Sequence, residues 1–367
     1  MTQERPLEIL KILSKAPAVA FHETLVSDLI KEILNDSRIL FDEDDFGNII
    51  AKINGSDPSS SPIAFVAHMD HPGFEVNFVS EEKITATPLG GVPYSTFVKG
   101  ADCFILNEKF EKVSCVLKPN DDIAIREVQV LGIDNLKVNT PIFFNIEDFS
   151  MDEEFIHMRA LDDLAGCAAI IAALENVIKD SSINTVYGIF TRAEEVGLIG
   201  ARLLAKAKIL PLNSFIVSVE TSSVIPGVIQ NEGPVIRTGD ASYTFDSEAE
   251  QVLLSTRDIL KKEDPDFKCQ RNLMSAGSCE ASAFMANGYR ATGVAFPLGN
   301  WHNATTEIKD PDSRIGSENI GIFDFLNGVK LIERAMKYAH FWNPKLISER
   351  YKHIDEGFMN RLSGKTN

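Results

Sequence analysis

The chain has 367 residues, of which 44% are hydrophobic and 24% charged, values typical of a folded globular protein. Its formal net charge of −17 argues against nucleic acid and anionic membrane as partners, because both bind through clustered lysine and arginine. The length exceeds a typical single domain and predicts one large core with an inserted or appended module.

The first residues and the cysteines predict a cytoplasmic protein. The N-terminal segment carries both acidic and basic charge and lacks the apolar block and the cleavage site of a signal peptide. The five cysteines are odd in number and scattered, with no C-x-x-C spacing, so reduced thiols are expected. No segment is apolar for long enough to span a membrane.

The chain opens with a helical pattern and then turns to strands. Apolar residues recur at helical spacing over residues 6–34, with a break near Ala16-Pro17, which predicts two helices covering a sheet. A turn at Asp45-Phe-Gly-Asn48 leads into a strand. The continuous apolar run over residues 63–67 then predicts a strand of a parallel sheet buried on both faces, and it stops at His68-Met-Asp70.

From residue 73 to about residue 155 the pattern changes to short alternating strands with glycine and proline turns. We expect strands at 74–79, 84–88, 103–106, 113–117 and 128–131. This pattern of short strands and turns predicts an inserted small β-barrel. The expected domains are a catalytic domain in two parts, residues 1–72 and 157–345, an inserted β-barrel domain at 73–156, and a peripheral C-terminal tail at 346–367.

Three later apolar strands repeat the pattern of the first. Strands at 185–190, 214–219 and 292–296 run into acids or imidazole, namely Glu194-Glu195, Glu220 and His302. Helical segments at 164–177 and 198–208 lie between strands, so we expect an α/β fold with a mixed, largely parallel central sheet flanked by helices. Ligands of such sheets bind outside the carboxyl ends of the strands.

Each candidate residue also has an ordinary structural explanation. His68 could be a hydrogen-bonded histidine at a strand end, with Asp70 on the same side of the extended chain accepting its imidazole N–H. Asp162 and Asp163 could cap the helix that follows them. Glu194-Glu195 could be ordinary acids at a helix start.

The doubled carboxylates also fit metal chemistry. Adjacent carboxylates repel one another unless one is solvated or a cation lies between them, which suggests that Asp162 bridges metals with Asp163 as an outer partner. Glu195 is expected to bind metal, and Glu194 to take a proton from metal-activated water. Imidazoles and carboxylates that converge at one rim suit zinc, manganese or cobalt. The expected metal ligands are His68, Asp162, Glu195, Glu220 and His302.

Several motifs in fixed order resemble the glutamyl-aminopeptidase-like (tetrahedral aminopeptidase) family of dimetal metallopeptidases over nearly the whole chain. They are Asp45-Phe-Gly-Asn48, His68-Met-Asp-His-Pro-Gly73, Pro88-Leu-Gly-Gly-Val92, Arg159-Ala-Leu-Asp-Asp-Leu-Ala-Gly166, Glu194-Glu-Val-Gly-Leu-Ile-Gly-Ala201, Gly233-Pro-Val-Ile236 and His302. The resemblance implies two divalent metal ions per subunit, zinc first and cobalt or manganese as alternatives. It also implies short peptides as substrates, cleaved at the N-terminal residue, and a homo-oligomer between a dimer and a dodecamer.

The resemblance also implies roles for the residues. One metal would be bound by His68 and Glu220, the other by Glu195 and His302, and Asp162 would bridge the two. The expected catalytic residues are Glu194 as base and Asp70 as the partner of His68. A β-barrel inserted after the first ligand strand would serve in dimerisation or as a lid.

Some positions depart from the family's pattern. Glu220, His71 and Leu164 replace its usual aspartate, glutamate and arginine, and two stretches near its substrate pocket are changed, at Cys279-Glu280 and Gly299-Asn300. These changes leave open a non-catalytic or differently specific metal-binding assembly protein of the same fold. A glucanase with Glu194-Glu195 as its carboxylate pair is a further alternative, but it gives the histidines no role.

Overall fold

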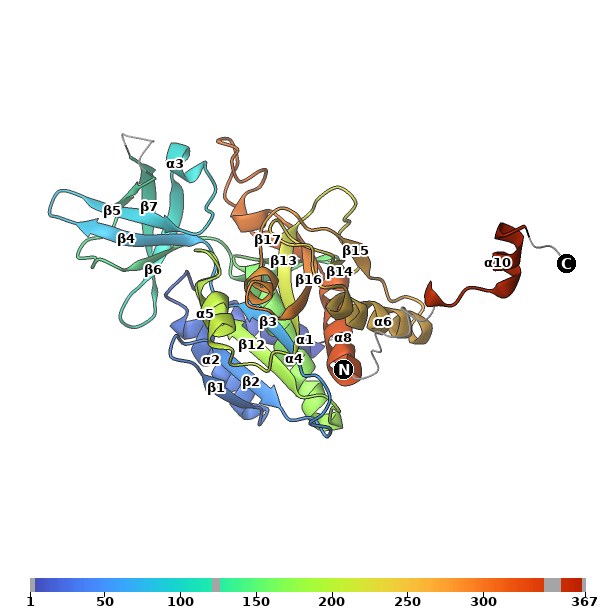
Figure 1. Ribbon diagram of the computed structural model, residues 1–367. Coiled ribbons are helices and arrows are strands. Elements are labelled where there is room, and N and C mark those ends of the chain that lie inside the picture. The colour runs from blue at the N-terminus through green and yellow to red at the C-terminus, as the bar shows by residue number, and fades with distance from the viewer. Residues whose placement is uncertain (1–3, 121–125, 340–350, 365–367) are drawn as a thin grey trace.

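The computed structural model describes residues 4–120, 126–339 and 351–364. An α/β body contains the central sheet, and a small β-barrel projects from one side of it (Figure 1). The C-terminal helix α10 (Glu356–Leu362) lies away from the body and has no buried residue. None of the helices in these ranges combines the length and the apolar character that a membrane crossing requires.

The central sheet is mixed, as the sequence predicts. Its strand order is β1-β2-β12-β3-β13-β16-β17-β11-β10, and β14 and β15 join it through β16. The neighbours β12, β3, β13 and β16 run parallel, whereas the strands on either side of this group pair antiparallel. The strands are β1 (Leu40–Glu43), β2 (Ile49–Ile53), β3 (Ile63–His68), β10 (Phe149–Met151), β11 (Phe155–Met158), β12 (Val186–Thr191), β13 (Phe215–Ser223), β14 (Val235–Arg237), β15 (Gln270–Asn272), β16 (Arg290–Gly299) and β17 (Glu318–Gly321).

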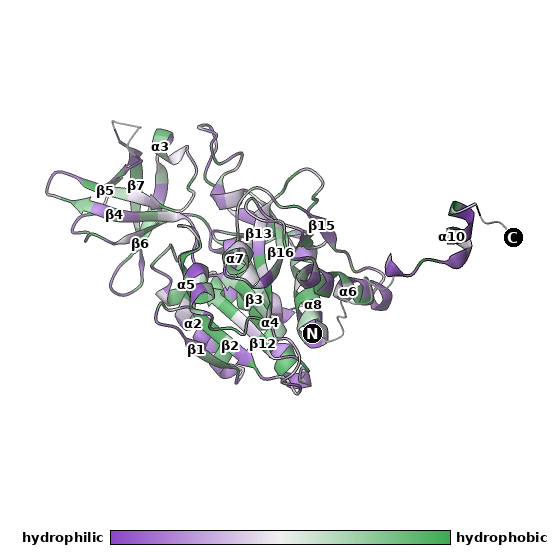
Figure 2. Cartoon of the chain, in the orientation of Figure 1, coloured by the Kyte–Doolittle hydropathy of each residue, from purple (hydrophilic) through white to green (hydrophobic). Residues whose placement is uncertain are grey.

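Strand β3 shows why the parallel strands are continuously apolar. Ile63, Phe65 and Ala67 pack into the core cluster that contains α4, and Ala64 and Val66 pack into the cluster on the other face, with α5 and α7. All six residues of β3 are buried. Because both faces are covered, an alternating polar pattern would leave polar groups unsatisfied. Figure 2 shows the hydrophobic residues concentrated along the central strands and α4.

Helices cover both faces of the sheet. One face carries α4 (Leu161–Asp180), packed between α1 (Glu4–Leu13) and α8 (Ile322–Tyr338), and the other carries α5 (Ile199–Ala207) and α7 (Glu280–Met285). The described body also contains α2 (Thr24–Asp36), α3 (Thr96–Lys99), α6 (Ser247–Glu263) and the short 3-10 helix η1 (Trp301–Asn303). The two opening helices and the helices predicted at 164–177 and 198–208 are all present.

Six antiparallel strands close into the barrel in the order β4-β5-β8-β7-β6-β9. They are β4 (Gly73–Val79), β5 (Ile84–Leu89), β6 (Ala101–Leu106), β7 (Lys112–Pro119), β8 (Val128–Leu131) and β9 (Pro141–Phe144). The five strands expected here are found, and β9 is an additional one. The barrel has its own apolar core, with Phe74 edge-on to Phe144.

The domain limits stay a proposal. Strand β10 and the start of β11 lie before residue 157, and both strands pair within the central sheet. The boundary expected between residues 345 and 346 lies outside the described residues.

Candidate metal centre and active-site pocket

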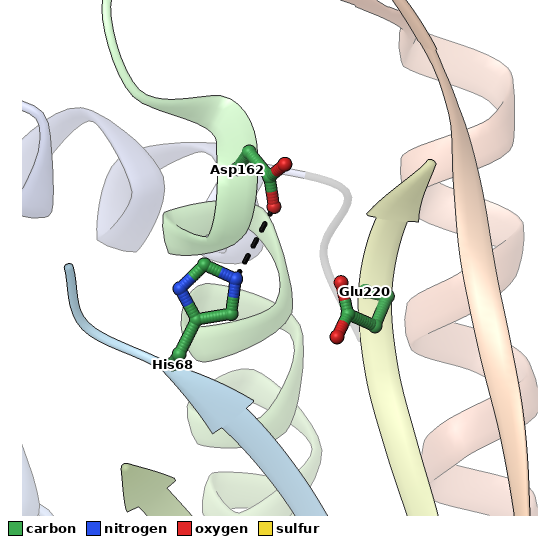
Figure 3. A group of neighbouring side chains, drawn as sticks. All are labelled: His68, Asp162 and Glu220. Atoms are coloured by element: carbon green, nitrogen blue, oxygen red, sulfur yellow. Dashed lines mark ion pairs between the residues drawn. The ribbon is translucent and has the colours of Figure 1, made fainter. Parts of the chain in front are cut away.

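A pocket of about 430 Å³ opens at the carboxyl ends of the parallel strands. The five expected metal ligands and Glu194 all line it. His68 is the last residue of β3, Glu220 lies in β13, and Asp162 stands at the start of α4. Figure 3 shows these three side chains pointing toward one another from their separate elements. The parallel register of β3 and β13 brings their ends to one rim.

The ligand atoms form groups small enough to hold a metal ion. His68, Asp162 and Glu220 offer atoms within 4.8 Å of one another, and so do Asp162, Glu195 and His302. Asp162 belongs to both groups. Its Oδ1 lies 3.3 Å from His68 Nε2, and its Oδ2 lies 3.6 Å from His302 Nε2. A third group joins His68 with Glu194 and Glu195.

Both imidazoles present Nε2 to the carboxylates. His68 Nδ1 lies 3.0 Å from the carbonyl oxygen of Asp70, and His302 Nδ1 lies 2.7 Å from that of Gly91. A carbonyl only accepts, so each Nδ1 donates, and a neutral ring then turns its Nε2 lone pair toward carboxylate oxygen. A metal ion or a proton is needed between them. Burial lowers the pKa of His68, but Glu194 and Asp162 outweigh it and raise that pKa well above its ordinary value.

Three carboxylate oxygens at the centre have no hydrogen-bond partner although they are buried. They are Asp162 Oδ1, Glu195 Oε1 and Glu220 Oε1. Burial, together with neighbouring carboxylates, raises the pKa of Glu195 and of Glu220 well above its ordinary value. Buried ionised carboxylates are stable only when they are paired or bind metal. The donor set therefore fits divalent cations.

The two aspartates at the start of α4 have different roles: one caps the helix and the other faces the pocket. Asp163 accepts from the backbone N–H of Gly166 and of His68, so it acts as a helix cap and holds the first ligand strand. Asp162 and Asp163 both have non-helical backbone angles. Asp162 is thereby turned toward the pocket, whereas Asp163 does not line it.

The Asp70 carboxylate accepts hydrogen bonds from the loop that carries Glu194 and Glu195, and not from the imidazole of His68. Its carboxylate lies 3.8 Å from His68 Nδ1, which donates to the Asp70 carbonyl oxygen. The carboxylate oxygens accept instead from the backbone N–H of Glu194, at 2.9 Å, and of Glu195, at 3.0 Å. Asp70 is fully buried, and burial raises its pKa to about 6.

A second buried acid, Glu23, holds the same loop, and no sequence motif marks it. Glu23 accepts from the backbone N–H of Ala193 at 3.0 Å and from the guanidinium of Arg192. Ala193 has φ of 52°, in the left-handed region that costs a residue with a side chain about 1–3 kcal/mol. In the sequence Glu23 resembles any acid that precedes a helix.

Asp70→Asn is expected to lower kcat/KM roughly tenfold to a hundredfold, because displacing a catalytic group by about 1 Å costs about 10²-fold. An amide has one acceptor oxygen, so either Glu194 or Glu195 loses the acceptor for its N–H. The measurement is steady-state kinetics at saturating metal, with metal content determined alongside.

The control is Asp246→Ala, which removes a carboxylate that accepts two backbone N–H groups at a place away from the pocket. Asp246 caps α6 by accepting from the backbone N–H of Glu248 and of Ala249, and it does not line the pocket. This variant should lose about 1 kcal/mol of stability and keep its activity. Equal activity losses in the two variants would show that Asp70 contributes only to stability.

The positions that depart from the expected family pattern lie in and beneath the pocket. Glu280 is fully buried and accepts from Thr191 Oγ1 and Ser218 Oγ at 3.3 and 2.8 Å. Ala276, Gly277 and Ser278, just before it, line the pocket. The imidazole Nδ1 of His71 lies 2.8 Å from the carbonyl oxygen of Asp162.

This α/β scaffold, with imidazoles and carboxylates grouped for cations at one rim, defines a metal-dependent hydrolase. The sequence profile of the M42 glutamyl aminopeptidase family matches residues 122–314, more than half of the chain. The chain therefore belongs to the M42 glutamyl aminopeptidase family and is a metallo-aminopeptidase. The resemblance stated from the sequence motifs is confirmed.

Related sequences and solved structures match between 54% and 93% of this chain. A lysyl aminopeptidase of Pyrococcus furiosus is 27% identical over 225 residues, covering 54% of this chain and 62% of that protein. A solved aminopeptidase from the archaeon Desulfurococcus kamchatkensis has a TM-score of 0.76 at 22% identity, covering 93% of this chain and 97% of the other. The TET1 peptidase of Pyrococcus horikoshii has a TM-score of 0.74 at 22% identity, covering 90% and 98%.

Proposed function

We propose that the chain removes N-terminal residues from short peptides with two divalent metals in the pocket. One metal would be bound by His68 and Glu220, the other by Glu195 and His302, with Asp162 between them. The observation that carries this proposal is that two ligand groups share Asp162 while three buried carboxylate oxygens around them lack hydrogen-bond partners.

Glu194 is the proposed general base. Metals bound at the site supply Lewis acidity, which polarises the scissile carbonyl and acidifies water. Glu194 lines the pocket, and its Oε2 lies 3.9 Å from His68 Nε2, next to the ligand groups. Burial raises the pKa of Glu194 to about 8, with further contributions from neighbouring carboxylates such as Glu280. A carboxyl group with a raised pKa can hold the proton between its removal from water and its delivery to the departing amine.

The acidic lining favours the free amino end of a peptide. Among the carboxylates that line the pocket, Glu194 is not a proposed metal ligand, so its charge is left to attract a protonated amine. An N-acetylated peptide offers no such charge. Hydrolysis should therefore depend on a free N-terminus.

The test compares a panel of short peptides with their N-acetylated forms, each with and without a chelator. We expect chelator-sensitive release of the first residue from the free peptides alone. Equal cleavage of the acetylated peptides would contradict aminopeptidase action. Elemental analysis of gently purified protein should find zinc, or cobalt or manganese in its place, at two ions per chain.

We also propose a homo-oligomer. The TET1 peptidase of P. horikoshii is described as assembling into a tetrahedron or a large octahedral shell, which motivates this expectation. Light scattering coupled to size-exclusion chromatography should give a mass of at least a dimer, and a monomer at all concentrations would reject the proposal. The cytoplasmic location stays a prediction from the sequence.

Family membership favours peptide hydrolysis over the glucanase and the non-catalytic alternatives. The proposal includes a changed specificity, because Ala276, Gly277 and Ser278, which directly precede the altered Cys279-Glu280, line the pocket. The peptide panel reports the preferred first residue directly.

A further inference from the structure

A buried carboxylate outside the pocket lining joins two of the proposed ligands. Glu318, the first residue of β17, is fully buried. Its Oε2 accepts from the backbone N–H of Leu161 at 2.8 Å and of Asp162 at 3.1 Å, and its Oε1 accepts from that of His302 at 2.9 Å. Among the described residues, no lysine, arginine or histidine forms an ion pair with it.

These three hydrogen bonds connect segments that are far apart in the sequence. Asp162 begins α4, His302 follows β16, and Glu318 begins the next strand of the sheet. The side chains of Asp162 and His302 meet 3.6 Å apart in the pocket. The two oxygens of one carboxylate therefore fix the backbones of two facing ligands.

His302 needs such an anchor. Its φ is 53°, and that of Asn303 is 64°, both in the left-handed region that residues with side chains rarely adopt. Strained backbone of this kind persists only where surrounding contacts hold it, and it is common at functional sites. The bond from His302 N–H to Glu318 is such a contact, and the bond from His302 Nδ1 to the Gly91 carbonyl is another.

A buried carboxylate without a cation is a costly means of stabilising a fold. Desolvation opposes its charge, and the backbone N–H groups compensate for it only in part. Burial raises the pKa of Glu318 well above its ordinary value, in keeping with this cost. Because Glu318 holds the backbones of two proposed metal ligands, it has a function besides fold stability.

We propose that Glu318 is a positioning residue that sets the separation of Asp162 and His302. It thereby sets the affinity for the metal that would be bound by Glu195, His302 and Asp162. The inference rests on the ligand assignment of the proposed function. Glu318 itself touches neither substrate nor metal, because it does not line the pocket.

The structure supplies a matched control in Asp324. This aspartate is also fully buried, and it accepts from the backbone N–H of Asn231 and of Gly233, both at 2.7 Å. It lies outside the pocket lining. Asp324→Asn therefore loses the same kind of hydrogen bond at a place with no proposed ligand.

The experiment titrates metal-free wild type, Glu318→Gln and Asp324→Asn with Co²⁺. Calorimetry measures the heat of binding, and visible absorption reports the geometry of the bound ion. Glutamine keeps the size of the side chain but has one acceptor oxygen, so either His302 or the Leu161-Asp162 pair faces an amide N–H. We expect at least a tenfold loss of affinity for one Co²⁺ and an altered absorption spectrum in Glu318→Gln. Asp324→Asn should keep both affinities and the spectrum, even if its Tm falls.

Wild-type affinities and spectrum in Glu318→Gln would overturn the positioning role, whatever its Tm. If that variant does not fold, Glu318→Asp replaces it, because it keeps both acceptors on a shorter stem. An unchanged Co²⁺ titration of Glu318→Asp would equally overturn the proposal. Failure of the wild type to bind Co²⁺ would instead overturn the ligand assignment, and this inference with it.

Discussion

Glu194→Gln is expected to lower kcat about 10²–10⁴-fold, the usual contribution of a general base. Glutamine fills the same space in the pocket but cannot take a proton from water. The proposed ligands stay in place, so the variant should still bind two metals. Steady-state kinetics on a free peptide, combined with elemental analysis of the same sample, measures both quantities.

The control for Glu194→Gln is Glu81→Gln, which makes the same chemical change at an exposed position on the barrel. It should keep wild-type kcat and KM. A Glu194→Gln protein that retains full activity would reject Glu194 as the base. One that loses a metal would show that Glu194 is a ligand, as the third group of metal-binding atoms allows.

Asp162→Ala is expected to remove both metals and to abolish activity. Asp162 belongs to the His68-Glu220 group and to the Glu195-His302 group, so its loss removes a donor from each. In the wild type, metal at a hundred times its Kd should stabilise the fold by about 2.7 kcal/mol for each site. Thermal unfolding with and without Zn²⁺ should therefore show a large rise in Tm for the wild type and none for the variant.

The chelated wild type is the control for Asp162→Ala. Without metal, burial opposes the charge of Asp162, but His68 and His302 pair with its carboxylate and lower its pKa, so the variant should be no more stable than the chelated wild type. An Asp162→Ala protein that holds two metals and gains the wild-type increase in Tm would show that Asp162 is not shared between them.

The core strands could be predicted because their signal is local. Strand β3 is an unbroken apolar run that ends in a histidine, and the run alone implies burial on both faces. Short strands such as β9 and β17 have only four residues each and lack such a pattern. Their pairing depends on distant partners, namely β4 and β6 for β9, and β16 and β11 for β17.

The candidate ligands could be proposed for the same reason, whereas the backbone contacts that hold them in place could not. His68 and Glu220 stand at the ends of recognisable strands. Glu23, Asp70 and Glu318 act by accepting backbone N–H groups. Every residue type except proline has such a donor, so these contacts leave no pattern in the sequence.

The wide spacing of the proposed ligands along the chain orders events during synthesis. His68 is made long before His302, and at about 5–20 residues per second the delay is on the order of ten seconds or more. A nascent chain that has reached only α4 carries His68 and Asp162 but lacks Glu195, Glu220 and His302. The full set of proposed ligands exists only once His302 has been made, so the complete centre cannot load metal early in synthesis.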